Sequence, residues 1–251
     1  MGASGVDWWQ PWLTPLHEWR QAFEHEDWRA ALSKQAAERC VCTARGKAIR
    51  FVNADDATDG VAYESHIAAT GRVPSRDNLH DRFNALIWIA YPRTKAALNA
   101  RQSDEIGRDG IAGQRGPVRD AATLIDESGL LLASDAPDVF GALRSHQWQL
   151  VLVDERARWG RSIVPLAFGH ALLDKLCGPF KSITAAVVPL PLGDGSAEAI
   201  DAAAAAFVQR AELAPRDLLH LPVLGIPGWW PPNENPRFYD DAHIFRSALS
   251  P

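Results

Sequence analysis

Apolar residues three and four positions apart recur along most of this chain, and this spacing predicts helices. In the run from Val73 to Asn99, one side of the predicted helix carries an apolar stripe made of Leu79, Phe83, Leu86 and Ala90. Pro92 divides this run, because proline lacks an amide hydrogen and disfavours helical geometry in the residue before it. We therefore expect one helix that begins near Asp77 and another that runs from Pro92 to about Gln102. The same spacing predicts helices from residue 15 onward and over residues 27–39, 61–69, 137–146, 163–177 and 196–213.

Shorter β-compatible stretches interrupt the helical pattern. Residues 48–53, 148–153 and 183–190 have the alternating or β-branched content of strands, although the length of 148–153 also fits a helix. Ser128 and Gly129 supply a turn between two further runs, so residues 121–134 predict a β-hairpin. From residue 221 onward, proline and glycine are too frequent for regular structure, yet the segment contains large aromatic residues that need burial: Trp229, Trp230, Phe238 and Tyr239.

These elements predict a single α+β domain over residues 1–251. We expect it to be mostly helical, with an N-terminal helical segment over 1–47, a core over 48–220 and a wrapping tail over 221–251. Its small sheet includes the β-hairpin, and the irregular tail, rich in proline and tryptophan, packs on the core. The composition agrees, because 47% hydrophobic residues in a chain of 251 can fill a substantial core.

The chain lacks the sequence features of secreted and membrane proteins. Its first residues are neither basic nor continuously apolar, and no stretch reaches the roughly 18 apolar residues that a membrane span needs. Cys40, Cys42 and Cys177 are an odd number of cysteines, which suits a reducing compartment. We therefore expect a soluble, cytoplasmic protein that has no membrane partner and does not depend on disulfide bonds.

Charge is distributed unevenly along the chain. The net charge of -5 argues against extensive nucleic-acid binding. Between Arg72 and Arg119, however, nine Lys or Arg residues stand against five Asp or Glu residues. Two interpretations are open: a solvated helix face with a basic loop, or a local positive field that attracts an anionic small molecule such as a phosphate ester. In the second interpretation, the substrate-binding residues are Arg76, Arg93, Lys95 and Arg119.

Polar side chains interrupt the apolar run where they can form a site. His80 and Asn84 are four residues apart, so they project from one face of the predicted helix. In the first helical turn, the positive end of the helix dipole favours a neutral imidazole, which can accept a proton or bind a metal. The structural alternative is that His80 helps to cap the helix and Asn84 bonds a neighbouring loop. The functional interpretation makes four residues catalytic: His80, Asp81, Asn84 and Glu127.

His170 is a second candidate, because it falls on the apolar stripe of its predicted helix and a buried imidazole needs a partner. Gly169 beside it lets another backbone segment or a ligand come close. A mixed site for zinc, manganese or iron can be assembled from two histidines and two acids, namely His80, His170, Asp120 and Asp126. The alternative is a satisfied core histidine with the acids in ordinary salt bridges.

The chain has no Walker loop, dinucleotide-binding glycine motif, G-x-S-x-G elbow or H-E-x-x-H motif. The leading hypothesis is therefore a metal-assisted hydrolase that acts on an anionic, phosphate-bearing substrate and uses a divalent metal. The competing hypothesis is a non-catalytic binding or assembly protein whose buried His, Asp and Asn network is structural.

Several separated blocks of this chain resemble a bacterial family of unknown function, domain family 3025, from about Phe51 to the C-terminus. The blocks are AYESHI at 62–67, the run at 73–99, RDAATLIDESG at 119–129, FGHALLDKL at 168–176 and LPVLGIPGWWPPNENPRFYDDAHIFR at 221–246. The resemblance implies a shared fold, and it implies that the tail from near Leu221 belongs to the domain. It assigns no role to any residue, so the site hypothesis rests on the residues themselves.

Overall fold

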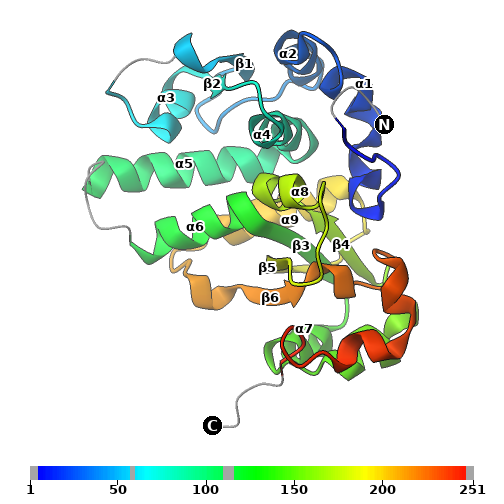
Figure 1. The fold of residues 1–251 in the computed structure, drawn as a ribbon. Helices are drawn as coiled ribbons and strands as arrows, with labels where there is room; N and C mark the ends of the chain where they lie inside the picture. Colours follow the sequence, from blue (N-terminus) through cyan, green and yellow to red (C-terminus); the bar gives the residue numbers. More distant parts are fainter. Residues whose placement is uncertain (1–4, 57–59, 110–115, 247–251) are drawn as a thin grey trace.

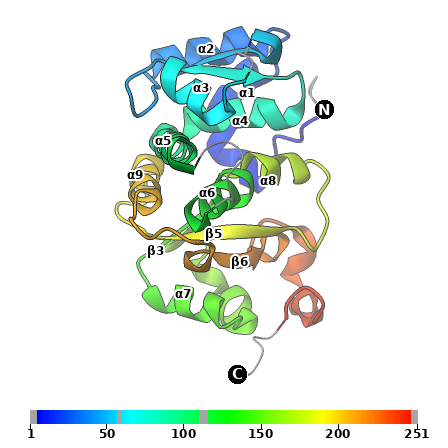
Figure 2. The ribbon, with the colours of Figure 1, turned by 90° about the vertical axis from the view of Figure 1, so that its left-hand side faces the viewer.

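A mixed four-stranded sheet lies in the middle of the molecule (Figures 1 and 2). This computed structural model describes residues 5–56, 60–109 and 116–246. The strands are β3 (Gly129–Ser134), β4 (Ile163–Ala167), β5 (Thr184–Pro191) and β6 (Leu219–Pro222). Their order is β4-β3-β5-β6, in which β3 and β5 are parallel and the two outer strands pair antiparallel with their neighbours. Every residue of β3 is buried, as expected for a strand that is covered on both faces.

Helices cover both faces of this sheet in layers (Figure 2). One face carries α6 (Pro117–Ser128), α8 (His170–Lys175) and α9 (Ala197–Val208), and the other carries α7 (Pro137–Arg144) and the C-terminal tail. The long helix α5 (Pro92–Asp109) packs on α6 and α9. Beyond it lies an outer layer made of α1 (Arg20–Phe23), α2 (Trp28–Glu38), β1 (Arg50–Asn53), α3 (Tyr63–Thr70), β2 (Arg72–Ser75) and α4 (Leu79–Ala90). Strands β1 and β2 form a separate parallel pair.

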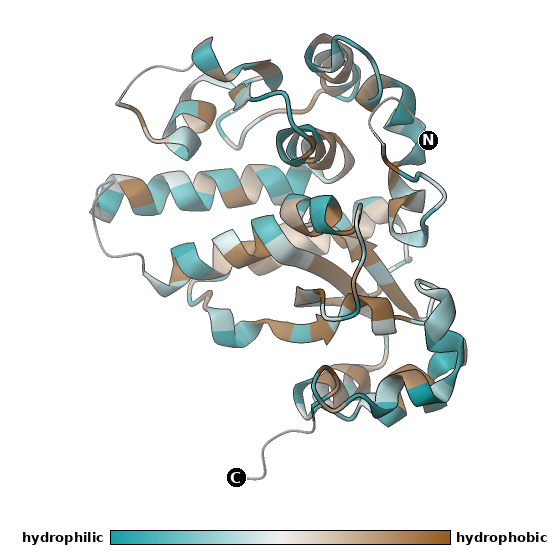
Figure 3. Ribbon diagram, viewed as in Figure 1, coloured by the Kyte–Doolittle hydropathy of each residue, from teal (hydrophilic) through white to brown (hydrophobic). Residues whose placement is uncertain are grey.

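These elements confirm the predicted α+β class and its mainly helical character. Figure 3 shows the strands of the central sheet in hydrophobic colours, with hydrophilic residues along the outer helices. In the part of the chain that the structure describes, none of the helices combines the length and apolar character required to cross a membrane.

Nearby side chains cap the starts of α2 and α4, whereas the start of α5 is capped from a distant helix. The Asp27 carboxylate accepts a hydrogen bond from the Ala30 amide and caps α2. The cap of α4 is Asn78, whose side chain accepts from the Asp81 amide at 2.8 Å. Asp77, near which we expected this helix to begin, instead accepts from the indole of Trp28 at 3.0 Å. At the start of α5, the cap comes from another helix.

That distant cap is Asp201 of α9. Its carboxylate accepts from the main-chain amides of Arg93 and Thr94, at 3.0 and 2.9 Å, and from the Thr94 hydroxyl at 2.6 Å. These amides belong to the first turn of α5 and have no partner within the helix. The Asp201 carboxylate of α9 therefore caps the start of α5 and links the two helices by hydrogen bonds.

The predicted hairpin over residues 121–134 is wrong in its first half. Residues 117–128 form α6, and only residues 129–134 form a strand. Pro117 suits the first helical turn, and Ala121, Ala122 and Ile125 are buried at helical spacing. Ser128 and Gly129 end a helix here and do not form a hairpin turn. The antiparallel partner of β3 is β4, more than thirty residues further along the chain.

Two other predicted elements are also wrong. Residues 148–153 were expected to form a strand, but Gln149–Asp154 forms a π-helical turn. Residues 163–177 were expected to be helical throughout, but they begin as strand β4 and become helical only at His170. Pro165 explains the second case, because proline disrupts a helix interior but is tolerated in an edge strand. The predicted strands over 48–53 and 183–190 are confirmed by β1 and β5.

The C-terminal tail packs on the core, as predicted. Beyond β6 it consists of short 3-10 turns at Val223–Gly225, Pro231–Glu234 and Pro236–Asp240, and similar turns occur at Pro11–Trp19, Ala54–Asp56, Arg156–Arg158 and Pro215–Asp217. Asn233 is fully buried and donates to the carbonyls of Leu224 and Ile226, both at 2.8 Å. Trp229 packs on Trp12 with ring centroids 6.0 Å apart. These contacts tie both ends of the described chain to the core.

Candidate functional site

A cavity of about 480 Å³ opens between the outer layer and the helices that cover the sheet. Its walls come from α3, β2 and α4 on one side and from α5, α6 and α8 on the other. The lining is rich in groups that can bind or transfer protons. They include Tyr63, Glu64, Arg76, His80, Asp81, Asn84, Asp126, Glu127 and His170.

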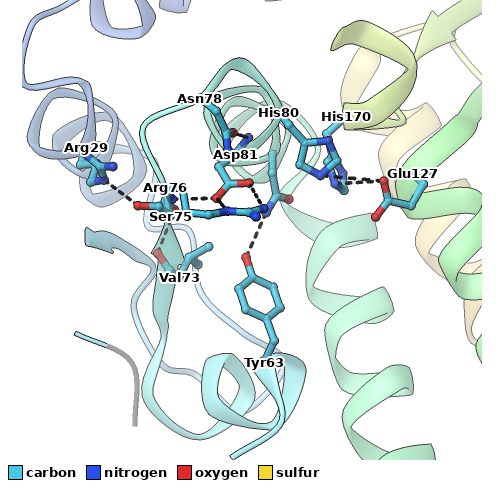
Figure 4. A network of polar contacts seen from close by, with 11 residues as sticks. Arg29, Tyr63, Val73, Ser75, Arg76, Asn78, His80, Asp81, Glu127 and His170 are labelled. Carbon is cyan, nitrogen blue, oxygen red and sulfur yellow. Dashed lines mark hydrogen bonds and ion pairs between the residues drawn. The ribbon is translucent and has the colours of Figure 1, made fainter. Parts of the chain in front are cut away.

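Three of these side chains form a compact cluster of potential metal ligands (Figure 4). The Glu127 Oε2 atom lies 3.9 Å from His80 Nε2 and 3.5 Å from His170 Nε2. The two imidazoles meet edge to face, with centroids 4.5 Å apart. Among the described residues, this trio is the group whose ligand atoms all lie within 4.8 Å of one another. The structure thus brings together the two predicted histidines and the predicted catalytic Glu127.

A close crossing of two backbone segments creates this cluster. Glu127 lies in the last turn of α6, and His170 is the first residue of α8. The amide of Gly169 donates to the carbonyl of Gly129 at 2.8 Å. A Cβ atom at Gly169 would lie only 2.4–2.6 Å from backbone atoms of residues 127–129. The expectation that Gly169 permits a close backbone approach is therefore confirmed, and this approach places His170 beside Glu127.

Burial controls protonation in the cluster. It lowers the pKa of His170 to about 4, so this imidazole is neutral at pH 7. The pKa of Glu127 is raised, first by burial and second by the negative charge of Asp126. A charged His170–Glu127 ion pair is therefore not favoured at neutral pH, and the histidine keeps a lone pair that can serve as a ligand.

Lys95 is the centre of a second, buried network. Its Nζ atom donates to Asp126 Oδ1 at 2.6 Å and to Asn84 Oδ1 at 2.8 Å, and it lies 5.4 Å from the ring centroid of Trp88. Burial tends to raise the pKa of Asp126, but the charge and hydrogen bond of Lys95, together with the nearby histidines, outweigh this effect and the pKa is lowered. Asn84 also donates from Nδ2 to the Tyr63 hydroxyl at 3.2 Å. Lys95 thus pairs with protein groups, and Asp126 pairs with Lys95 and lies outside the His80–Glu127–His170 cluster.

Arg76 and Asp81 pair at the edge of the cavity (Figure 4). Asp81 accepts from the Arg76 amide at 2.7 Å and from its guanidinium at 3.0 and 2.9 Å. Burial tends to raise the pKa of Asp81, but these hydrogen bonds and the Arg76 charge lower it. The Arg76 side chain is 67% exposed, so the guanidinium also faces solvent.

Four predicted site residues do not line this cavity: the buried Lys95 described above, and Arg93, Arg119 and Asp120. Arg93 is exposed, and its main-chain amide bonds to Asp201. Arg119 has a buried Nη1 atom without a hydrogen-bond partner among the described residues. Asp120 lies seven residues before Glu127 on α6, which corresponds to a separation of about 10 Å along the helix axis. That distance explains why the acid in the ligand cluster is Glu127.

Sequence reasoning missed Glu64, which lines the same cavity. Its carboxylate accepts from Asn99 Nδ2 at 2.7 Å, and its main-chain carbonyl accepts from the same amide at 2.9 Å. Burial, followed by the negative charge of Asp126, raises the pKa of Glu64 to about 7. Two features of the sequence pointed to this contact: Asn99 interrupts an apolar run, and Glu64 lies in the AYESHI block.

Comparison with known proteins identifies the family of this chain. The family described as a protein of unknown function (DUF3025) matches residues 49–248, and the chain therefore belongs to it. No curated protein and no solved structure matches the chain.

Proposed function

We propose that this member of the DUF3025 family is a metal-dependent hydrolase that acts on an anionic, phosphate-bearing substrate. In this proposal His80, Glu127 and His170 hold a divalent ion. The observation that carries it is the convergence of two imidazoles and one carboxylate within 4.8 Å on the wall of a 480 Å³ cavity.

The dimensions of the cluster suit a metal site. Ligand atoms around a tetrahedral ion with bonds of about 2.0–2.1 Å lie about 3.3 Å apart. The two distances from Glu127 Oε2 to the imidazole nitrogens, 3.5 and 3.9 Å, require only small side-chain rotations to reach that value. Two histidines and a carboxylate are a common ligand set of catalytic zinc sites and of mononuclear iron sites. Zinc, manganese and iron are therefore the candidate ions.

Charge in the cavity links substrate binding to the metal. Four carboxyl groups line it, those of Glu64, Asp81, Asp126 and Glu127, whereas Arg76 is the cation in the lining. Without further positive charge, this lining disfavours an anion. A bound divalent ion supplies that charge and acts as a Lewis acid on an ester oxygen. Arg76 can then bind the anion through the solvent-facing part of its guanidinium.

Glu64 is the proton-transfer group in this proposal. Its pKa of about 7 allows the carboxyl group to exist in both protonation states near neutral pH. Asn99 holds it through one side-chain hydrogen bond, which leaves the second carboxyl oxygen available to a substrate or water. A group with these properties can act as a general acid or a general base.

A non-catalytic binding or assembly role is the second candidate. It is favoured by the Lys95–Asp126–Asn84 network and the Arg76–Asp81 pair, whose polar groups already bond to one another. Such networks can stabilise a fold without any chemistry. For either role we propose a cytoplasmic location, because Cys40, Cys42 and Cys177 are free and exposed, which suits a reducing compartment.

The test is elemental analysis of untagged protein that is purified without chelator, followed by titration with zinc, manganese and iron. The site variant replaces both His80 and His170 by alanine. A matched control replaces His220 and His243, which are exposed and distant in sequence. We expect about one equivalent of metal in the wild type and the control, and none in a folded site variant. Equal metal content in all three proteins, or no binding of any of these ions, would refute the proposal.

A further inference from the structure

The buried Lys95 determines how the Asn84 amide group is oriented. A lysine ammonium can only donate hydrogen bonds, so the atom of Asn84 that lies 2.8 Å from Lys95 Nζ must be the carbonyl oxygen. The amide NH₂ group of Asn84 therefore points the other way, toward Tyr63. Lys95 is held in place by Asp126, so the orientation is built into the core.

This orientation in turn determines the role of the Tyr63 hydroxyl. The NH₂ group of Asn84 can only donate, so the Tyr63 oxygen must accept the hydrogen bond of 3.2 Å between them. Within the described chain, this is the only hydrogen bond of the Tyr63 hydroxyl to a protein group. The hydroxyl hydrogen is consequently available for a bond to another molecule.

The available hydrogen faces a place where a ligand can bind. Tyr63 lines the cavity together with Arg76 and His80, so a ligand in the cavity can contact it. Figure 4 shows the phenol pointing from α3 toward the Arg76–Asp81 pair. Both oxygens of Asp81 already accept hydrogen bonds from Arg76. A phenol remains protonated at pH 7, so its hydroxyl is a donor under physiological conditions.

We propose that Tyr63 donates a hydrogen bond to an oxygen of the substrate's phosphoryl group, on the side of the cavity opposite α6. This inference rests on the proposed function, because the metal supplies the charge that brings the anion into the cavity. In it, Lys95 and Asn84 are positioning residues that keep the Tyr63 hydroxyl turned to the substrate. A preorganised hydrogen-bond donor binds an oxyanion without first having to reorient.

The experiment measures binding of inorganic phosphate to protein that has been loaded with zinc and freed from excess metal. Calorimetric titration compares the wild type with Tyr63→Phe, which keeps the ring and removes the hydroxyl. Tyr91→Phe is the matched control, because Tyr91 is buried elsewhere and its hydroxyl has no hydrogen-bond partner among the described residues. We expect Tyr63→Phe to bind zinc normally and phosphate about 10- to 100-fold more weakly, the loss typical of a hydrogen bond to a charged group. Tyr91→Phe should resemble the wild type.

A second variant, Asn84→Asp, reverses the hydrogen bond while it keeps the phenol. The new carboxylate can accept from both Lys95 and the Tyr63 hydroxyl, so the hydroxyl hydrogen turns away from the cavity. The added negative charge also weakens phosphate binding, and the double variant separates the two effects. Tyr63→Phe should cost 10-fold or more in the wild-type background and less than about 2-fold in the Asn84→Asp background.

The outcomes distinguish this inference from the proposed function. If zinc does not bind the wild type, the proposed function fails and the inference fails with it. If zinc binds but phosphate binds equally to wild type and Tyr63→Phe, only the role of Tyr63 is refuted. Equal costs of Tyr63→Phe in both backgrounds would likewise show that Asn84 does not direct the hydroxyl.

Discussion

Replacement of Glu64 by glutamine should make this protein more stable at alkaline pH and leave its stability unchanged in acid. The pKa of this carboxyl group is about 7 in the folded protein, against an ordinary value of 4.5. Below pH 4.5 the group is protonated in both the folded and the unfolded chain and contributes nothing. As the pH rises from 4.5 to 7, the unfolded chain loses this proton first, so the stability of the wild type falls. Above pH 7 the folded protein carries the full free-energy cost of the ionised Glu64 carboxylate.

The magnitude follows from the two pKa values. A difference from 4.5 to about 7 corresponds to at most about 3 kcal/mol. Partial exposure of Glu64 reduces this figure, so we expect a gain of about 1–3 kcal/mol for Glu64→Gln at pH 8.5. Glutamine keeps a carbonyl oxygen that can accept the hydrogen bond from Asn99. The substitution therefore removes the charge without removing this contact.

The assay is urea unfolding followed by tryptophan fluorescence, at pH values from 4 to 9. Glu26→Gln serves as the control, because it makes the same change of charge at an exposed position. The difference between Glu64→Gln and wild type should increase from near zero at pH 4 to its full value above pH 7. A difference that is constant with pH, or that decreases as the pH rises, would show that Glu64 is not a buried acid with a raised pKa.

Three further substitutions test the fold around the site. Lys95→Met should destabilise the protein by about 3–5 kcal/mol in urea unfolding, because it leaves the buried Asp126 carboxylate unpaired, and adding Asp126→Leu should recover most of the loss; an unaffected single variant would contradict this. Gly169→Ala should cost about 2 kcal/mol or more and weaken zinc binding, because its Cβ would lie 2.4–2.6 Å from backbone atoms; wild-type zinc affinity would argue against the crossing as the origin of the cluster. Asp201→Ala should lower the free energy of unfolding by about 2 kcal/mol in thermal unfolding, since the Thr94 amide loses its cap; an unchanged free energy would mean that water replaces the Asp201 carboxylate as the acceptor.

Local patterns in the sequence identify much of the wall of the cavity. The apolar stripe of α4 places His80 and Asn84 on one helical face, and both line the cavity. Gly169 beside His170 indicates a close backbone approach, which the structure confirms. These inferences succeed because each depends on the geometry of a single helix or on the absence of one side chain.

Inferences that combine distant segments are less successful. The acids Asp120 and Asp126 were grouped with the histidines, but the ligand cluster contains Glu127. This difference follows from the hairpin prediction. Side chains alternate between two faces along a strand but follow a 3.6-residue period along a helix, so the two structures turn different acids toward the histidines. Glu64 was missed because an acid on an amphipathic helix usually faces water, and its burial depends on packing against α5.

The sequence by itself determined the α+β class, most helices, the buried tail and the candidacy of His80, His170 and Glu127. Those features depend on periodicity, capping and turn chemistry, which act over a few residues. Only the tertiary structure decided that Glu127 lies beside both histidines, that Lys95 pairs with Asp126, and that Asp201 caps a helix that begins more than one hundred residues earlier. These contacts join segments far apart in the chain, and their partners are selected by how whole layers pack, which no local pattern contains.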